Sequence, residues 1–166
     1  MGMLQRRMHN KEDKTYVILG APHSATSFVA KALQDAGIEI GNDMSYLHQD
    51  SAFVYLNKEI LAQAGGDWKN PPKEKDIMKV DFDKQIKLLI EKKKGKFWGW
   101  KDPSTSLTIK KYLPHLDGDV YFICCFRKPQ KIVDSYGKKD KLITRKLIDR
   151  FNKSLISVVK EFCDLK

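Results

Sequence analysis

The sequence predicts a single α/β domain in which helices flank a mainly parallel sheet. Two observations predict this fold. Short apolar segments alternate along the chain with longer segments whose apolar residues recur at helical spacing. The segment Val120 to Phe126 is apolar without alternation, which is typical of a parallel strand covered on both faces. The 166 residues suffice for one hydrophobic core.

The first elements are a strand and two helices. Thr15 to Leu19 is apolar and β-branched, which indicates a buried strand. The turn Gly20 to Ala25 leads into a helix from Thr26 to Ala36, which Gly37 ends. A second helix extends to Ala64, and Ser51 is its predicted N-cap.

The middle of the chain contains a loop, two helices and a strand. Asp67 to Lys79 includes two adjacent prolines and is predicted to be a loop. A helix follows over Asp83 to Lys94, and Phe97 to Trp100 is a short aromatic strand. Asp102 and Pro103 are the predicted N-cap and first residue of a helix that ends near Leu113.

The last elements are a strand and two helices. After the strand over Val120 to Phe126, Pro129 begins a helix that Gly137 can end. The final helix runs from about Asp140 to Phe162. The chain is therefore divided into a polar tail over 1–14 and one domain over 15–166.

Composition predicts a cytoplasmic protein without a membrane span. No apolar run reaches the roughly 18 residues that cross a bilayer, and the polar tail does not match a signal peptide. Cys124 and Cys125 are neighbours on a strand and point to opposite faces, so we expect buried, reduced thiols and no metal pair.

The net charge of +10 favours an anionic partner. The lysine runs at 92–94 and 138–139 are typical of a solvated surface. The chain contains no recognised nucleic-acid motif, so a nucleic-acid partner is not predicted. A polyanionic small cofactor explains part of the charge.

Polar residues follow three of the predicted strands, where ligands of parallel sheets bind. The loop Gly20 to Ser27, G-A-P-H-S-A-T-S, lies between a strand and a helix and can hold a phosphate on backbone N–H groups. It has the spacing of a Walker A loop without its lysine, which argues against a kinase. Lys101 ends the aromatic strand, and Arg127 ends the third strand eight residues before Ser135. An arginine and a serine suit a terminal phosphate.

The order of these three motifs resembles the sulfotransferase family. That family has a [KR]-S-G-T-[ST] loop for a 5′-phosphosulfate and an R-x7-S pair for a 3′-phosphate. The loop from Pro22 to Ser27 and the pair Arg127 and Ser135 match them. The K-D-P element at Lys101 is similar to that of Golgi and bacterial members, and the stretch Phe53 to Pro72 is similar to bacterial members. The likeness covers Thr15 to Phe162.

The resemblance implies a three-layer P-loop-type domain that binds 3′-phosphoadenosine 5′-phosphosulfate (PAPS) and needs no metal. It implies transfer of the sulfuryl group to the hydroxyl of a small molecule or a glycan. Lys101 would stabilise the leaving oxygen, and Arg127 and Ser135 would hold the 3′-phosphate. The residues expected at the 5′-phosphosulfate are His23, Ser24, Ala25, Thr26 and Ser27.

The sequence departs from the family pattern at three positions. His23 replaces the usual Lys or Arg, and Ala25 replaces a glycine. Gln49 lies where bacterial relatives often carry a glutamate base, and an amide cannot accept a proton. His48 is the predicted base, and the alternatives are Asp50 or no base at all. Because family members usually continue past the last helix, we expect a short or an incomplete member.

Two other functions stay open at this point. A non-catalytic relative that binds the bisphosphate product is compatible with Gln49 and Ala25. A small-molecule kinase of the same fold would show magnesium dependence.

Overall fold

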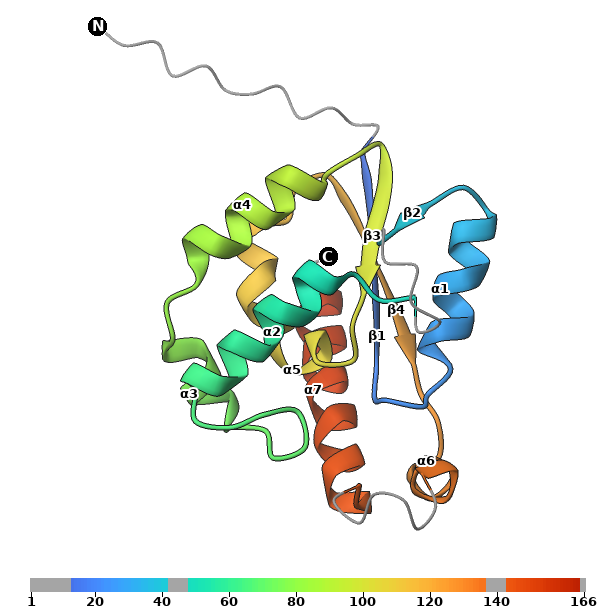
Figure 1. Cartoon of the computed structure of the whole chain (residues 1–166), viewed down its shortest axis with the longest axis vertical. Helices are drawn as coiled ribbons and strands as arrows, with labels where there is room; N and C mark the ends of the chain where they lie inside the picture. The colour runs from blue at the N-terminus through green and yellow to red at the C-terminus, as the bar shows by residue number, and fades with distance from the viewer. Residues whose placement is uncertain (1–12, 42–47, 137–142, 165–166) are drawn as a thin grey trace, which may run out of the picture.

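Four parallel strands form the centre of the fold (Figure 1). The computed structural model describes residues 13–41, 48–136 and 143–164. The order across the sheet is β2-β3-β1-β4. The strands are β1 Lys14–Gly20, β2 Glu39–Ile40, β3 Phe97–Lys101 and β4 Asp119–Cys125.

Strand β1 lies in the interior of the sheet because its apolar residues can be covered on both faces. Val17, Ile18 and Leu19 have no exposed surface. The register aligns Ile18 with Lys101 of β3, and Gly20 with Cys125 of β4. Because the three strands are parallel, their carboxyl ends lie at one edge of the sheet.

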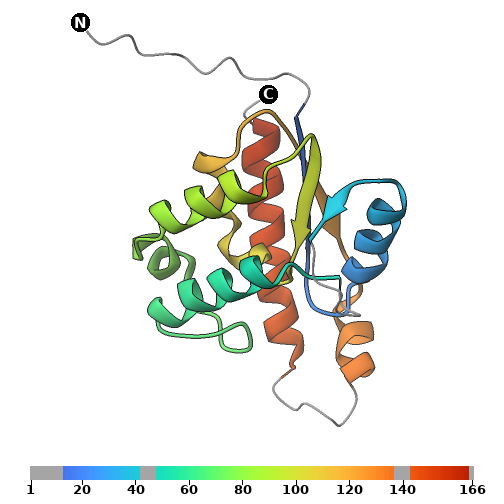
Figure 2. The same ribbon diagram turned by 45° about the horizontal axis from the view of Figure 1, so that its top comes forward.

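Helices cover both faces of this sheet (Figures 1 and 2). One face packs against α1, and the other packs mainly against α2, α5 and α7. The helices are α1 Thr26–Asp35, α2 Ser51–Gln63, α3 Glu74–Lys79, α4 Asp83–Lys93, α5 Thr105–Tyr112, a 3-10 turn Leu113–His115, α6 Pro129–Tyr136 and α7 Arg145–Asp164. Within the described ranges, each helix is too short or too polar to cross a bilayer.

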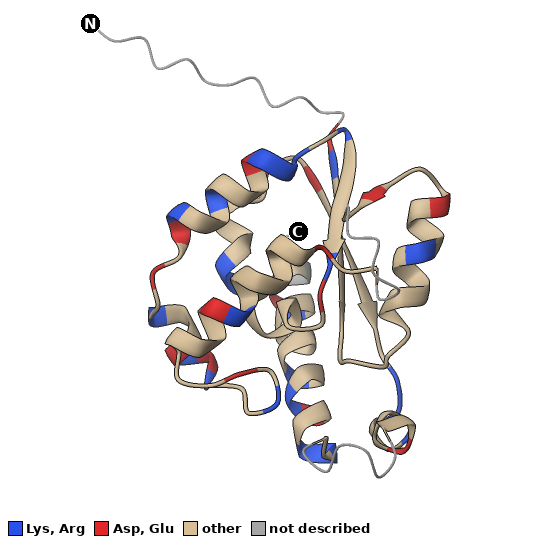
Figure 3. Ribbon diagram, viewed as in Figure 1, with Lys and Arg blue, Asp and Glu red and all other residues tan. Residues whose placement is uncertain are grey.

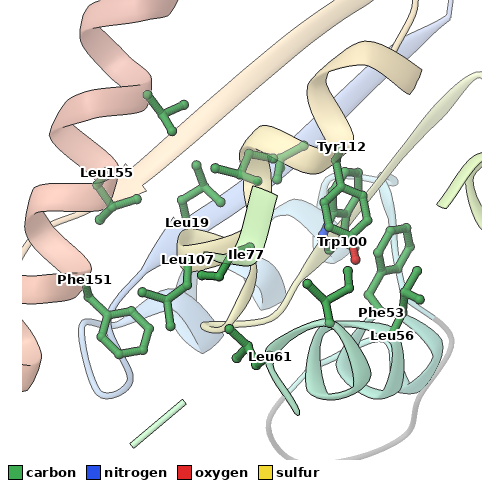
Figure 4. Packing of buried hydrophobic residues seen from close by; sticks show 14 of the residues in the cluster. Leu19, Phe53, Leu56, Leu61, Ile77, Trp100, Leu107, Tyr112, Phe151 and Leu155 are labelled. Atoms are coloured by element: carbon green, nitrogen blue, oxygen red, sulfur yellow. The ribbon is translucent and has the colours of Figure 1, made fainter. Parts of the chain in front are cut away.

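Aromatic side chains fill the core between β3 and α2 (Figure 4). Phe53 stacks on Trp100 with ring centroids 4.3 Å apart, and Trp100 also contacts Tyr112 at 5.6 Å. All three side chains are fully buried. These contacts hold α2 and α5 against the end of β3, where Lys101 begins the site described below.

The predicted α/β fold with a parallel sheet is confirmed, and three predicted boundaries are corrected. Asp50, not Ser51, caps α2, because its carboxylate accepts from the N–H groups of Ala52 and Phe53. Helix α5 begins at Thr105 rather than at Pro103, since residues 102–104 first form a turn. Helix α7 begins at Arg145, and the predicted start at Asp140 lies outside the described residues.

Two elements were not predicted, and one strand is less covered than expected. Strand β2 has only two residues, too few for a periodic pattern. Helix α3 lies inside the predicted loop over 67–79 and buries Ile77. Strand β4 lies at the sheet edge and is partly exposed along its length, so it is not covered on both faces. Its thiols, Cys124 and Cys125, are half-buried rather than buried.

Candidate functional site

The carboxyl ends of the strands surround one cavity of about 690 Å³. We call it the site cavity. One wall comes from the loop between β1 and α1, and Lys101 and Arg127 lie at the ends of β3 and β4. Gln49, Val54 and Trp68 line another part of the wall. The size is ordinary for a small-molecule or cofactor site.

The loop after β1 presents the start of α1 to the site cavity. Ala25 precedes the helix with φ of 70° and has no side-chain acceptor to cap it. The first-turn N–H groups of an uncapped helix suit an anion. Thr26 and Ser27 line the cavity. Ser24 does not, because its hydroxyl donates to the carbonyl of Ala21 at 2.6 Å inside the turn.

Gly20 closes this loop tightly. A Cβ at Gly20 would lie 2.5 Å from Oγ of Ser24 and 2.9 Å from the carbonyl oxygen of Cys125. The backbone amide of Gly20 donates to Oγ of Ser106 at 2.9 Å. The turn therefore depends on a residue without a side chain and is anchored to α5.

His23 lines the site cavity in a defined orientation. Its ring stacks on Tyr136 with centroids 3.9 Å apart, and its Nδ1 lies 2.9 Å from Oγ of Ser135. Because the Ser135 hydroxyl donates to the carbonyl of Ile132, the Nδ1 atom of His23 carries the proton of this bond. The Nε2 atom is then an acceptor in the neutral ring and a donor in the cation. Burial and the charge of Arg127 lower the pKa of His23.

Arg127 joins the two predicted phosphate sites. Its Nη1 donates to the carbonyl oxygen of His23 at 2.9 Å, and its exposed side chain lines the site cavity. Ser135 is exposed and does not line the cavity, but its bond to His23 places it beside Arg127. The structure thus brings together Arg127, Ser135 and His23, which are far apart in the sequence.

Lys101 is a buried cation aimed at the loop. Only 2% of its surface is exposed, and its Nζ donates to Oγ of Ser27 at 3.1 Å. Burial lowers the pKa of Lys101 to about 8, although the nearby Asp102 and Cys125 act in the opposite direction. Burial and the bond to Ser27 hold Lys101 in place before any ligand binds. Lys101 can therefore act as a fixed positive charge in the site.

Asp102 is the site residue that sequence reasoning missed. It was predicted as a helix cap, but its carboxylate is buried at the wall of the site cavity. Its Oδ2 accepts from Nδ2 of Asn57 at 2.8 Å, while Oδ1 has a 3.5 Å contact with Nε2 of Gln49. Burial raises the pKa of Asp102, and the bonds from Asn57 and from the Ser104 amide, together with the charge of Lys101, oppose the rise.

A buried network fixes the orientation of Asp102. Asn57 also donates to Oγ1 of Thr105 at 2.8 Å and accepts from the hydroxyls of Thr108 and Tyr112 at 2.6 and 2.8 Å. Every polar atom of the Asn57 side chain is thereby used. One signal for this role was available in the sequence, since Asp102 directly follows Lys101 at a strand end.

His48 is not among the residues that line the site cavity. Its Nδ1 lies 2.8 Å from Oε1 of Gln34, whose own amide donates to the carbonyl of Ile40. The bond therefore requires a proton on Nδ1 of His48. Asp50, the alternative base, caps α2 and pairs with Lys93 at 2.7 Å. Neither His48 nor Asp50 lines the site cavity, where a base would have to meet the acceptor hydroxyl.

The cavity wall offers no carboxylate cluster for a metal. Among the described residues, no three His, Cys, Asp or Glu side chains gather closely enough to hold an ion. Apart from Tyr136, the ionisable groups that line the site cavity are His23, Lys101, Asp102 and Arg127.

Comparisons of the chain with protein-family models, with curated proteins and with solved structures returned no match.

Proposed function

We propose that this chain transfers a sulfuryl group from PAPS to an acceptor hydroxyl without a metal ion. The observation that carries the proposal is the convergence of Lys101, His23 and Arg127 with the first turn of α1 on the site cavity. A donor with two anionic ends needs two cationic positions, and the cavity provides both. The loop resembles a sulfotransferase phosphosulfate loop in sequence as well.

The two ends of the donor would occupy different walls. The 5′-phosphosulfate suits the N–H groups of Thr26 and Ser27 at the start of α1. The 3′-phosphate suits Arg127, whose guanidinium can make charge-assisted bonds, with Ser135 beside it. On binding, Arg127 and Ser135 would exchange their present contacts with His23 for contacts with phosphate oxygens.

The reaction is an in-line displacement at sulfur. The acceptor oxygen forms a bond to sulfur while the bond from sulfur to the bridging phosphate oxygen breaks. Adenosine 3′,5′-bisphosphate leaves with the bonding electron pair. Lys101, already fixed 3.1 Å from Ser27, meets the charge that develops on the bridging oxygen. His23 in its cationic form can donate to the same oxygen.

Asp102 is the proton acceptor in this proposal, in place of His48. Asp102 lines the site cavity, and its Oδ1 makes only a long contact, of 3.5 Å, with Nε2 of Gln49. Burial raises the pKa of Asp102, which makes the carboxylate a stronger base than an exposed aspartate. The acceptor proton would pass to this carboxylate as sulfur is attacked.

Binding without transfer is the second candidate, and Gln49 favours it. The amide of Gln49 lines the site cavity and cannot accept a proton. The same contact with Asp102 could hold the carboxylate away from an acceptor. A chain of this kind would bind adenosine 3′,5′-bisphosphate and transfer nothing.

Nucleotide-induced thermal stabilisation tests the donor site. Adenosine 3′,5′-bisphosphate should stabilise the chain without magnesium, and more than AMP or ATP with magnesium does. At about 100 times the dissociation constant, the gain should be roughly 2.7 kcal/mol. Arg127→Ala should weaken bisphosphate binding by about 1.5–3 kcal/mol, the typical cost of losing a charge-assisted contact.

Lys128→Ala is the matched control, because Lys128 is exposed and adjacent and carries the same charge. It should leave the affinity nearly unchanged. Equal stabilisation by AMP and the bisphosphate would contradict the assigned 3′-phosphate site. ATP stabilisation that needs magnesium would instead support a kinase.

A further inference from the structure

A second cavity, of about 730 Å³, lies beside the first turns of α7. Its lining contains basic side chains from two distant parts of the chain and a single acidic one, Asp149. We call this cavity the basic groove. Its basic residues are Lys69, Arg145, Lys146, Arg150 and Lys153.

Three of these residues form a stripe on α7. Lys146, Arg150 and Lys153 follow the helical spacing that places side chains on one face, and they span about 10 Å along the axis. Lys146 and Lys153 are exposed. Nη2 of Arg150 donates to the carbonyl of Pro72, which ties the loop after α2 to this face. Figure 3 shows basic segments of that loop and of α7 side by side.

The basic groove and the site cavity are lined by consecutive residues of one loop. Trp68 lines the site cavity, while the next two residues, Lys69 and Asn70, line the basic groove. The Nζ atom of Lys69 lies 5.3 Å from the ring centroid of Trp68. The stripe on α7 therefore lies near the part of the site cavity that Trp68 lines.

We propose that the basic groove binds the anionic groups of an acidic oligosaccharide acceptor while one of its hydroxyls lies in the site cavity. This inference rests on the proposed sulfuryl transfer. A sugar chain supplies hydroxyls and regularly spaced carboxylates or sulfates on one backbone. The face of a sugar ring suits the apolar wall made by Val54, Trp68 and Pro103.

A nucleic acid fits these residues less well. Single-stranded nucleic acids bind through successive bases stacked on several aromatic side chains. Trp68 and Tyr136 are the Phe, Trp or Tyr residues that line the two cavities, and the ring of Tyr136 is stacked on His23. The ring of Trp68 beside the stripe on α7 suits a sugar chain in which one ring stacks on Trp68 and the next sugars carry anionic groups.

The test is binding of defined chains to the full protein and to two charge-reversed variants. The groove variant is Lys146→Glu with Lys153→Glu. The matched control is Lys84→Glu with Lys87→Glu, which changes the net charge equally at exposed positions of α4 that line neither cavity. The probes are oligogalacturonate as the carboxylated chain, dextran sulfate as the sulfated chain, malto-oligosaccharide as the neutral chain, and poly(U).

The wild type should bind one or both acidic sugar chains, more weakly as salt rises, and should not bind the neutral chain. The groove variant should lose at least about tenfold in affinity and the control less than about threefold, because reversal of a contact charge costs more than a change in the general field. Both variants should keep the stabilisation by adenosine 3′,5′-bisphosphate. With PAPS and the bound sugar chain, the groove variant should raise KM and leave kcat nearly unchanged.

Equal losses in the two variants would overturn the groove, since overall charge would then explain the binding. If poly(U) bound more tightly than either acidic sugar chain, and the groove variant lost this binding, the groove would bind a nucleic acid and the proposed ligand class would be wrong. Absence of binding to any acidic chain would also overturn the proposal. A wild type that binds acidic sugars through the groove but neither binds the bisphosphate nor transfers sulfate would refute the proposed function and leave the groove standing.

Discussion

Lys101→Met should stabilise the ligand-free chain and at the same time abolish most of the proposed sulfuryl transfer. A pKa of about 8 in place of 10.5 corresponds to about 3 kcal/mol that disfavours the charged amine in the folded state. Methionine fills a similar volume without the charge. Loss of the bond to Ser27 costs about 1 kcal/mol. The net gain at pH 7 should be about 2 kcal/mol, or roughly 4–8 °C for a chain of this size.

The sign of the pH dependence follows from the direction of the pKa shift. Above pH 10.5, Lys101 is neutral in both the folded and the unfolded chain and carries no penalty. The penalty grows as the pH falls from 10.5 to about 8 and is constant below that. The stability gain of Lys101→Met should therefore be full at pH 7 and absent near pH 10.5, where only the cost of about 1 kcal/mol for the lost bond to Ser27 remains.

Urea unfolding of both proteins at pH 7 and pH 10.5 measures this difference, and the other titrating lysines cancel in the comparison. Turnover of labelled PAPS should fall by about 10²–10³ in Lys101→Met, while bisphosphate affinity changes by less than about tenfold. A variant that is less stable than the wild type at pH 7 would refute the electrostatic argument. An active wild type whose rate is unaffected by the substitution would refute the catalytic role.

Two further substitutions test the proposed proton acceptor and the packing of the sheet. In Asp102→Asn, turnover should fall by about 10²–10⁴. The wild-type rate should fall at acid pH as the carboxylate of Asp102 is protonated near its raised pKa, and this acid limb of the pH–rate profile should disappear in the variant. A variant profile that keeps the acid limb would show that Asp102 only orients Asn57. Gly99→Ala should destabilise the chain by about 3 kcal/mol or more, because its Cβ would lie 1.9 Å from the carbonyl oxygen of Tyr16. Gly95→Ala, whose Cβ would lie 3.4 Å from Oε2 of Glu39 and 3.8 Å from Cβ of Trp98, should cost far less in the same urea titration.

The sequence predicted the parts of the site that follow directly from the strands. Lys101 and Arg127 end apolar segments that could be recognised locally, and parallel strands bring such ends to one edge. The loop Gly20 to Ser27 was predicted because it directly follows an apolar strand. All of these residues could be predicted without knowing how the helices pack.

Residues placed by distant contacts could not be predicted in this way. Trp68 reaches the site cavity on a loop that Arg150 holds through Pro72, and no local pattern reports a bond between residues so far apart. His48 is turned toward Gln34 of α1 rather than toward the cavity. The role of Asp102 depends on Asn57 of α2, which becomes its neighbour only when α2 and α5 pack together.

The interior position of β1 also determines when the chain can fold during synthesis. Its partners, β3 and β4, follow it by about 80 and about 100 residues, and long loops must close before such pairs form. At about 5–20 residues per second, a ribosome needs several seconds to deliver β4 after β1. Until β3 emerges, Val17, Ile18 and Leu19 have no partner strand, and the second side of β1 stays unpaired until β4 follows. Nascent chains of this protein should therefore occupy chaperones that bind short apolar segments until most of the sequence has emerged.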